Sequence, residues 1–373
     1  MVIKKIKDGE IRLGEPLPWP VSDEHGMLLL RKGYVINSQS QLNALMMRGV
    51  YIHAGMQGAI KAVAASEEPQ SPFQLMDNFQ VRLRHLCESF KSGAHQDLPQ
   101  RILQVCRDIQ QLCIMDADAA LGAVHLVQWE NCSPGQDLHV AILVELILRS
   151  LGLDSEDRVP ILAAALTHDV GMFGLKEVLD KQTTPLSESQ WVEVRRHPAR
   201  SVDALRAIGV ADTIWLDAVL HHHERQDGSG YPDGLKENGI PLSARVVGIA
   251  DIYCALIKPR AHRKAMLAKQ ALRDIFLKRA GSVDERLAQL FVKELGVYPP
   301  GAFVKLHNSE VAIVTHRSKN GSCPIVQSVV GPRGAPLARP IKRDTSAEEV
   351  VIQDMVARDK AVSINLHSLW GYA

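Results

Sequence analysis

Residues 159–169 read Val-Pro-Ile-Leu-Ala-Ala-Ala-Leu-Thr-His-Asp, an apolar run that ends in an adjacent histidine and aspartate. We expect this segment to lie in a helix over Asp157–His168, because its apolar residues continue a helical pattern. A buried carboxylate at the end of such a run is costly unless it is paired. A cation beside Asp169 would remove that cost, so the segment predicts a buried helix that ends at a metal site.

A helical pattern extends on both sides of this segment, from Phe73 to Gly296, with apolar residues at the spacing of one helix face. The clearest helices are expected at Asp137–Leu151, Asp157–His168, Ser187–Arg196, Pro198–Ile208, Ala211–Glu224, Ser243–Ile257 and Ala265–Arg279. Pro198 is placed at a helix start because an interior proline breaks the hydrogen-bond ladder. Strand patterns are absent from this stretch, so we expect a mainly α fold built around a helical bundle.

Regions with strand character flank the helical part. Residues 1–60 contain short extended pieces between turns and a helix expected at Ser40–Arg48, so they predict a small β-rich N-terminal module. Residues 61–75 have the composition of a linker. The helical domain is then expected over 76–300. Alternating apolar residues return after it, so residues 301–373 predict a short C-terminal β appendage and tail.

Length, charge and composition exclude several classes of protein. The chain has 373 residues, enough for two or three domains. Its 43 Lys+Arg and 42 Asp+Glu give a formal net charge of +1, so no general attraction to DNA is expected. The apolar runs are shorter than the roughly 18 residues of a membrane span. Residues 1–10 lack the apolar core of a signal peptide, and the six cysteines are scattered, so we expect a cytoplasmic protein.

Histidines and aspartates recur through the helical part in a definite order. The informative set is His139, His168-Asp169, His197, His221-His222-His223 and Asp251. Imidazole and carboxylate groups together suit Fe, Mn, Zn, Co or Ni. One histidine alone would more often be an ordinary core or surface residue. His139, however, lies on a helix that is apolar nearly all round, so it must find a partner inside the protein.

These motifs, taken in order, resemble the HD-GYP branch of the HD-domain metal-dependent phosphohydrolases. The matching segments are His168-Asp169, His222-His223-Glu224-Arg225, Asp227-Gly228-Ser229-Gly230-Tyr231-Pro232, Ile240-Pro241-Leu242 and Ala250-Asp251-Ile252-Tyr253. The resemblance covers residues 125–305 and implies a helical bundle of the HD type with a two- or three-metal centre. It also implies hydrolysis of the bacterial second messenger cyclic di-GMP to pGpG or GMP.

The resemblance assigns roles to individual residues. It implies metal binding by His139, His168, Asp169, His197, His222, His223 and Asp251. Asp169 would bridge two ions and form the catalytic pair with His168. Arg260 and Arg263 would hold the phosphate, because a guanidinium can donate two parallel hydrogen bonds. The loop Gly230-Tyr231-Pro232 would contact a guanine; the alternatives are solvated arginines and a tyrosine that only packs the loop.

The departures from the family pattern concern catalysis more than metal binding. The family places a lysine after His-Asp-x-Gly, where this chain has Met172, and some three-metal members place a glutamate at the position of Gly135. Two divalent ions are therefore expected, iron or manganese first, with zinc, cobalt and nickel as alternatives. Loss of a general acid costs about two to four orders of magnitude in rate. The metal ligands remain, so a slow phosphodiesterase of bacterial signalling is expected.

Two other functions stay open. A catalytically silent receptor or protein-interaction module would keep the metal site and bind cyclic di-GMP without turnover. Another cyclic dinucleotide or nucleotide is the other alternative, because the sequence has no base-reading signature. Signalling proteins such as diguanylate cyclases, and a second copy of the chain in a homodimer, are the protein partners left open.

Overall fold

The computed structural model describes two compact units, 1–70 and 71–373. The described residues are 3–5, 11, 17, 21–22, 28–30, 33–36, 51–53, 71–93, 97–127, 135–261, 263–279, 281–318, 321–358, 362 and 364–372. The first unit contains an antiparallel sheet in the order β1-β4-β2-β3, with strands β1 (Ile3–Lys5), β2 (Val21–Ser22), β3 (Leu28–Leu30) and β4 (Tyr51–His53). The expected β-rich module is confirmed. The expected helix Ser40–Arg48 and linker residues 61–70 lie outside the described residues.

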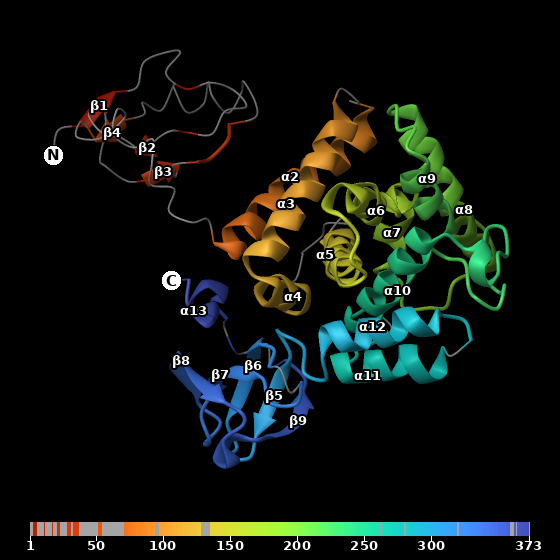
Figure 1. Ribbon diagram of the computed structural model, residues 1–373. Helices are drawn as coiled ribbons and strands as arrows, with labels where there is room; N and C mark the ends of the chain where they lie inside the picture. Colours follow the sequence, from red (N-terminus) through yellow and green to blue (C-terminus); the bar gives the residue numbers. More distant parts are fainter. Residues whose placement is uncertain are drawn as a thin grey trace. The chain divides into compact units, whose positions relative to one another are not determined.

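The second unit is mainly helical, as expected (Figure 1). Its α-helices before the C-terminal sheet are α2 (Pro72–Ser92), α3 (Leu98–Met115), α4 (Ala117–Leu126), α5 (Gly135–Ser150), α6 (Ser155–Thr167), α7 (Phe173–Leu179), α8 (Glu188–Ala207), α9 (Thr213–His221), α10 (Leu242–Ile257), α11 (Ala268–Arg273) and α12 (Glu285–Leu295). Short 3₁₀ turns η3 (Val170–Met172) and η4 (Glu237–Gly239) and a π-helical turn η5 (Asp274–Lys278) complete it. Among the helices that the structure describes, none is both long and apolar enough to cross a bilayer.

Helix α5 is the centre of the helical unit. Every residue from Gly135 to Leu148 is buried, and the helix packs against α3, α6 and α10. A helix that is apolar nearly all round has to be enclosed in this way. Its one acidic residue in the apolar run, Glu145, pairs with Arg158 of α6 at 3.0 Å. The start of α5 therefore carries its polar residues into the interior, beside α6 and α10.

The expected break before Pro198 is wrong. Helix α8 runs without interruption from Glu188 to Ala207, with Pro198 inside it. A proline has no N–H, so the carbonyl four residues earlier, that of Val194, loses its usual backbone donor. Nδ1 of His197 donates to this carbonyl instead, at 2.5 Å. The side chain of the preceding residue thus compensates for the proline, and the helix continues.

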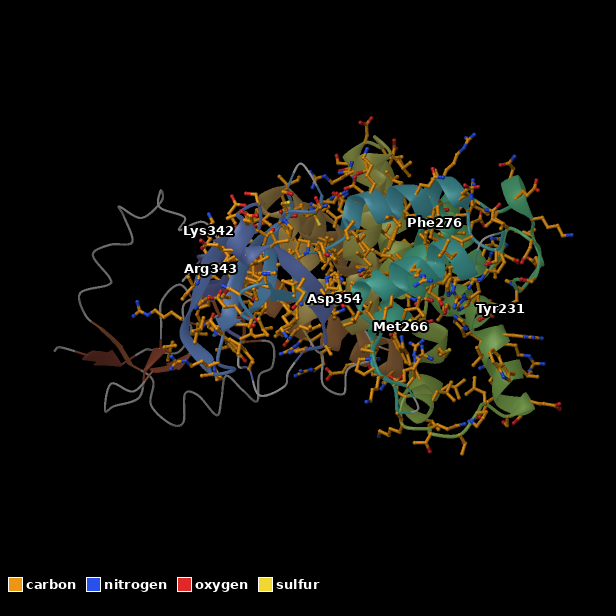
Figure 2. All side chains as sticks on the ribbon, turned by 90° about the horizontal axis from the view of Figure 1, so that it is seen from below. Tyr231, Met266, Phe276, Lys342, Arg343 and Asp354 are labelled. Carbon is orange, nitrogen blue, oxygen red and sulfur yellow. The ribbon has the colours of Figure 1, made fainter. Side chains whose placement is uncertain are left out.

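The C-terminal β appendage is also confirmed. An antiparallel sheet has the order β8-β7-β6-β5-β9, with strands β5 (Phe303–Leu306), β6 (Val311–His316), β7 (Ile325–Val330), β8 (Pro336–Asp344) and β9 (Ile352–Val356), and α13 (Leu366–Trp370) follows it. Apolar residues of β5 and β6 join the helical core, and Arg317 pairs with Asp118 of α4. Figure 2 shows Lys342 and Arg343 on this sheet and Tyr231 at the opposite end of the unit.

Candidate metal centre

Most of the candidate metal ligands meet where four helices converge. His168 and Asp169 follow α6, His197 lies on α8, His222 and His223 follow α9, and Asp251 lies on α10. Nε2 of His197 lies 3.3 Å from Oδ1 of Asp169 and 3.3 Å from Nε2 of His222. Nε2 of His168 lies 3.7 Å from Oδ1 of Asp251. Six side chains from distant parts of the sequence therefore share one small interior volume.

The donor atoms of these residues fall into two overlapping groups. Within the described part of the chain, two sets of three side chains have donor atoms that all lie within 4.8 Å of one another: His197, His222 and His223, and His168, Asp169 and His222. Each set offers nitrogen or oxygen ligands of the kind that borderline divalent ions prefer. His222 belongs to both sets, so the two sets adjoin, and its one available nitrogen could serve an ion in either of them.

Three of the imidazole rings are oriented by their own backbone. In each, Nδ1 donates to the carbonyl three residues earlier: His168 to Ala165 at 2.8 Å, His197 to Val194 at 2.5 Å and His222 to Val219 at 2.7 Å. The carbonyls of Ala165 and Val219 lie at helix C-termini, where no later backbone N–H reaches them, and Pro198 leaves the third without its donor. Because Nδ1 is engaged with the backbone, Nε2 is the nitrogen that each ring turns toward the centre, and it is the atom each ring can offer to a metal ion once it is deprotonated.

The rings differ in protonation: His222 and His223 are neutral, whereas the neighbouring carboxylates favour the charged form of His168. Burial lowers the pKa of His222 well below its usual range and that of His223 to about 3, so both imidazoles are neutral. Burial also lowers the pKa of His168, but the carboxylates of Asp169 and Asp251 outweigh it and raise this pKa to about 10. The buried Nε2 of His168 has no hydrogen-bond partner in the described part of the chain. A divalent cation would satisfy the same carboxylates and the same nitrogen.

The carboxylate of Asp169 faces both halves of the centre. Oδ1 lies 3.3 Å from Nε2 of His197, and Oδ2 lies 3.8 Å from Nε2 of His168. Burial raises the pKa of Asp169, but Lys176 and His168 outweigh this and hold the pKa well below its usual range. An ionised carboxylate with one oxygen toward each group of histidines has the arrangement of a bridging ligand.

Asp169 is held in place by close packing of its loop against α8. Oγ of Ser201 donates to the carbonyl of His168 at 2.7 Å and accepts from the N–H of Gly171 at 3.0 Å. A Cβ at Gly171 would lie 2.6 Å from the backbone nitrogen of Ser201. Only glycine allows the backbone of this loop to come so close to α8. The close contact places Asp169 next to His197.

The glycine-rich loop after α9 lies against the histidines. The ring centroids of Tyr231 and His223 are 4.8 Å apart. Both carboxylate oxygens of Glu224 accept backbone N–H groups of this loop, from Asp233 at 2.7 Å, Gly234 at 3.1 Å and Leu235 at 3.0 Å. A Cβ at Gly230 would lie 2.4 Å from the backbone nitrogen of Arg225, so glycine is needed there too. Glu224 therefore holds the end of the loop that contains Tyr231.

The other candidate residues, His139, Arg260 and Arg263, belong to neither set of donors. His139 is buried on α5, where burial lowers its pKa to about 3, and it belongs to neither set of three donors. Arg260 is exposed and pairs through its backbone with Arg263. Nη2 of Arg263 donates to the carbonyls at the end of α10, and its buried Nε has no hydrogen-bond partner in the described part of the chain.

Several residues of the centre were not expected from the sequence. Nε2 of Gln136 donates to Oδ1 of Asp251 at 3.2 Å. Nζ of Lys176 lies 2.6 Å from Oδ2 of Asp169 and 3.5 Å from Oδ1 of Asp137. Their only sequence signal is the polar or charged side chain itself, which stands beside other polar residues, Gln136 before Asp137 and Lys176 before Glu177.

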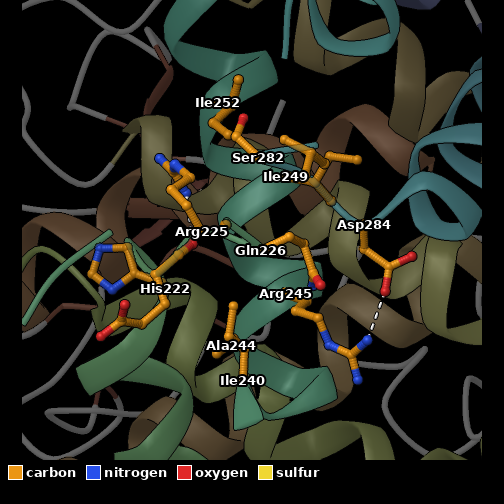
Figure 3. Close-up of a pocket in the computed structure, with 13 residues that line it drawn as sticks. His222, Arg225, Gln226, Ile240, Ala244, Arg245, Ile249, Ile252, Ser282 and Asp284 are labelled. Atoms are coloured by element: carbon orange, nitrogen blue, oxygen red, sulfur yellow. Dashed lines mark hydrogen bonds and ion pairs between the residues drawn. The ribbon is translucent and has the colours of Figure 1, made fainter. Parts of the chain in front are cut away.

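A small pocket adjoins the centre on the side of α10 (Figure 3). His222 and Arg225 line it together with apolar residues such as Ile249. Nη1 of Arg245 pairs with Oδ2 of Asp284 at 2.6 Å along another side. Burial lowers the pKa of Arg225, and the carboxylate of Asp251 opposes this shift. A partly buried guanidinium therefore lies near the candidate metal ligands.

The structure thus defines a helical bundle with interior histidines and aspartates that could hold metal ions. Residues 119–287 match the family described as HD domain. The solved structure of an HD-GYP protein from Bdellovibrio bacteriovorus is similar, with a TM-score of 0.52 at 15% identity, over 78% of this chain and 99% of that chain. This likeness concerns the fold, and it confirms the expected bundle of the HD type.

Characterised relatives match part of the chain. A cyclic di-GMP phosphodiesterase of Pseudomonas aeruginosa is 34% identical over 151 residues, 40% of this chain and 36% of the relative. A cyclic di-GMP phosphodiesterase response regulator of Xanthomonas campestris is 29% identical over 219 residues, 57% of this chain and 56% of the relative. A 3'3'-cGAMP-specific phosphodiesterase of Vibrio cholerae is 35% identical over 138 residues, 37% of this chain and 30% of the relative. The resemblance to the HD-GYP branch is confirmed, and the chain spans about half or less of each relative.

Proposed function

We propose that the protein is a cytoplasmic metal-dependent phosphodiesterase that hydrolyses cyclic di-GMP to pGpG or GMP. The observation that carries this proposal is the pair of overlapping donor sets, with Nε2 of His168, His197 and His222 directed inward. The named activities of the relatives support the choice of substrate.

Two divalent ions, iron or manganese, would neutralise phosphate charge and lower the pKa of a water molecule. Asp169 would hold both ions through its two oxygens, and Asp251, held by Gln136, would complete the half that contains His168. His139 is proposed as a further ligand from α5, where it lies buried. The protein thus supplies a rigid set of donors whose orientation needs no rearrangement when substrate arrives.

The substrate would be held by groups around this centre. Tyr231, which lies with Gly230 and Pro232 in the loop whose end Glu224 holds, offers its ring to a guanine. Arg260 is exposed, and Arg263 has one amino group engaged at the end of α10, so we propose that Arg260 and the remaining guanidinium nitrogens of Arg263 contact the phosphate. Met172 carries no charge, so turnover is expected to be slow.

The test is product analysis on the metal-loaded protein. Chain loaded with Mn²⁺ or Fe²⁺ is incubated with cyclic di-GMP and the products are separated by chromatography. We expect pGpG or GMP from the wild type and none from Asp169→Asn, which loses the bridging charge. Metal-loaded wild type that forms neither product would contradict the proposal.

A silent receptor is the second candidate, and the uncharged Met172 favours it. It predicts calorimetric binding of cyclic di-GMP without any linear product. The same assay with 3'3'-cGAMP tests the third possibility, which the relative from Vibrio cholerae supports. Faster hydrolysis of that dinucleotide would change the assigned substrate but not the class of reaction.

A further inference from the structure

Lys176 brings a positive charge into the candidate metal centre from an unexpected position. Its ammonium lies 2.6 Å from Oδ2 of Asp169 and 3.5 Å from Oδ1 of Asp137, and its side chain is only 8% exposed. The motif position that is a lysine in the resembling family is Met172 here, four residues earlier. Lys176 lies on α7, which begins at Phe173, directly after Met172 at the end of the 3₁₀ turn η3.

The surroundings of Lys176 show why this charge matters. Asp137 is completely buried, and its Oδ2 has no hydrogen-bond partner in the described part of the chain. Asp169 is buried as well. Two carboxylates in an interior site are costly unless a cation lies beside them. Lys176 is the ammonium that lies within 4 Å of both, so it supplies the compensating charge.

The contact with Asp169 also constrains geometry. Oδ2 is the oxygen on the side of His168, whereas Oδ1 points at His197. A hydrogen bond from Lys176 to Oδ2 therefore fixes the plane of the carboxylate between the two donor sets. Removing partners that orient metal ligands in this way typically costs about 10–100-fold in metal affinity or activity.

We infer that Lys176 is a positioning residue that orients Asp169 and neutralises Asp137. It thereby supplies, four residues further along the chain, the positive charge that Met172 lacks. The expected effect of Lys176 on kcat rests on the proposed function, and no other part of this inference does. The expected effect of Lys176 on the thermal stability of the metal-free protein does not depend on which substrate the protein has.

The test compares Lys176→Met with the swap variant Met172→Lys/Lys176→Met, which moves the charge to the family position. Lys181→Met is the control, because Lys181 is exposed on the segment that follows α7. In the metal-free protein, Lys176→Met should lower the midpoint of thermal unfolding by about 5 °C or more, since two buried carboxylates lose their cation. Saturating Mn²⁺ should recover most of that loss.

The kinetic arm uses the same three variants with Mn²⁺ and cyclic di-GMP. We expect kcat of Lys176→Met to fall by about 10–100-fold, kcat of the swap variant to recover to within about threefold of the wild type, and the control to be unchanged. A lysine that only packs α7 would not be rescued by a charge at position 172. Recovery in the swap variant is therefore the result that supports a transferable charge.

Three results would overturn the inference: wild-type thermal stability of metal-free Lys176→Met, wild-type kcat of that variant, or a swap variant as slow as Lys176→Met. If Lys176→Met is too unstable to purify, Lys176→Met/Asp137→Asn removes the unpaired charge as well and should be the more stable protein; equal instability contradicts the charge argument. If the wild type has no phosphodiesterase activity, the proposed function fails, and the thermal and Mn²⁺ measurements still decide the role of Lys176.

Discussion

Nδ1 of His197 donates to the carbonyl of Val194 at 2.5 Å, and this bond exists because the next residue, Pro198, has no N–H to offer that carbonyl. Helix α8 therefore continues through Pro198 without a break. The carbonyl that this proline leaves free also orients His197, a candidate metal ligand. His168 and His222 reach the same orientation at helix ends, where free carbonyls occur anyway.

Replacing Pro198 separates its effect on the stability of α8 from its effect on the orientation of His197. Pro198→Ala adds a backbone N–H that competes with Nδ1 of His197 for the carbonyl of Val194. We expect the affinity for Mn²⁺, measured by titration calorimetry, to fall by about tenfold, while the thermal midpoint of the metal-free protein stays the same or rises because alanine favours a helix. Pro160→Ala, in α6, is the matched control and should leave metal affinity unchanged. Unaltered affinity in Pro198→Ala would show that the ring does not depend on this bond.

The loop that contains Tyr231 depends on Glu224. Glu224→Gln keeps one carbonyl oxygen but replaces the other acceptor of backbone N–H groups by a donor, so the loop should loosen. We expect KM for cyclic di-GMP to rise several-fold with little change in bound Mn²⁺, measured by steady-state kinetics and elemental analysis. Glu237→Gln, an exposed glutamate nearby, serves as the control. A loss of metal without a change in KM would contradict a role confined to the loop.

The buried ion pair between Glu145 and Arg158 should dominate the stability of the central helices. Glu145 is 0% and Arg158 9% exposed, so Arg158→Met leaves an unpaired interior carboxylate. We expect the free energy of unfolding in urea to fall by about 3–5 kcal/mol, and the double variant Glu145→Leu/Arg158→Met to regain most of it. Arg107→Met, which breaks an exposed pair with Glu156, should cost about 0–1 kcal/mol. If Arg158→Met and Arg107→Met lost the same free energy of unfolding, burial would not be what makes the pair of Glu145 and Arg158 important.

The C-terminal sheet carries a carboxylate whose contribution to stability depends on pH. Hydrogen bonds from Arg343, opposed by burial and aided by Ser328, lower the pKa of Glu310 to about 2. Because the pKa is lower in the folded than in the unfolded chain, this contribution is complete above about pH 4.5 and is lost as the pH falls toward about 2.

The difference in thermal midpoint between wild type and Glu310→Gln should therefore be largest near neutral pH and shrink below about pH 4.5. Exposed Glu349→Gln is the control. A difference that does not vary with pH would mean that the ionised form is not what stabilises the sheet.

The sequence alone determined the class of fold and the chemical types gathered at the site. Helical periodicity and the turn residues around the short strands are local properties, so the helical bundle and both β-rich regions could be predicted from neighbouring residues. The order of the His and Asp motifs was enough for the HD-GYP resemblance. The adjacency of His168 and Asp169 at the end of an apolar run was enough to indicate a buried cation site.

Only the tertiary structure decided how these groups are oriented and balanced. The continuation of α8 through Pro198, the inward direction of the imidazole nitrogens and the contact of Lys176 with Asp169 depend on single hydrogen bonds or ion pairs. Such contacts have no periodic pattern in the sequence. Their strength comes from burial, which makes an unpaired charge costly and thereby selects the partner, and burial is a property of the packed chain.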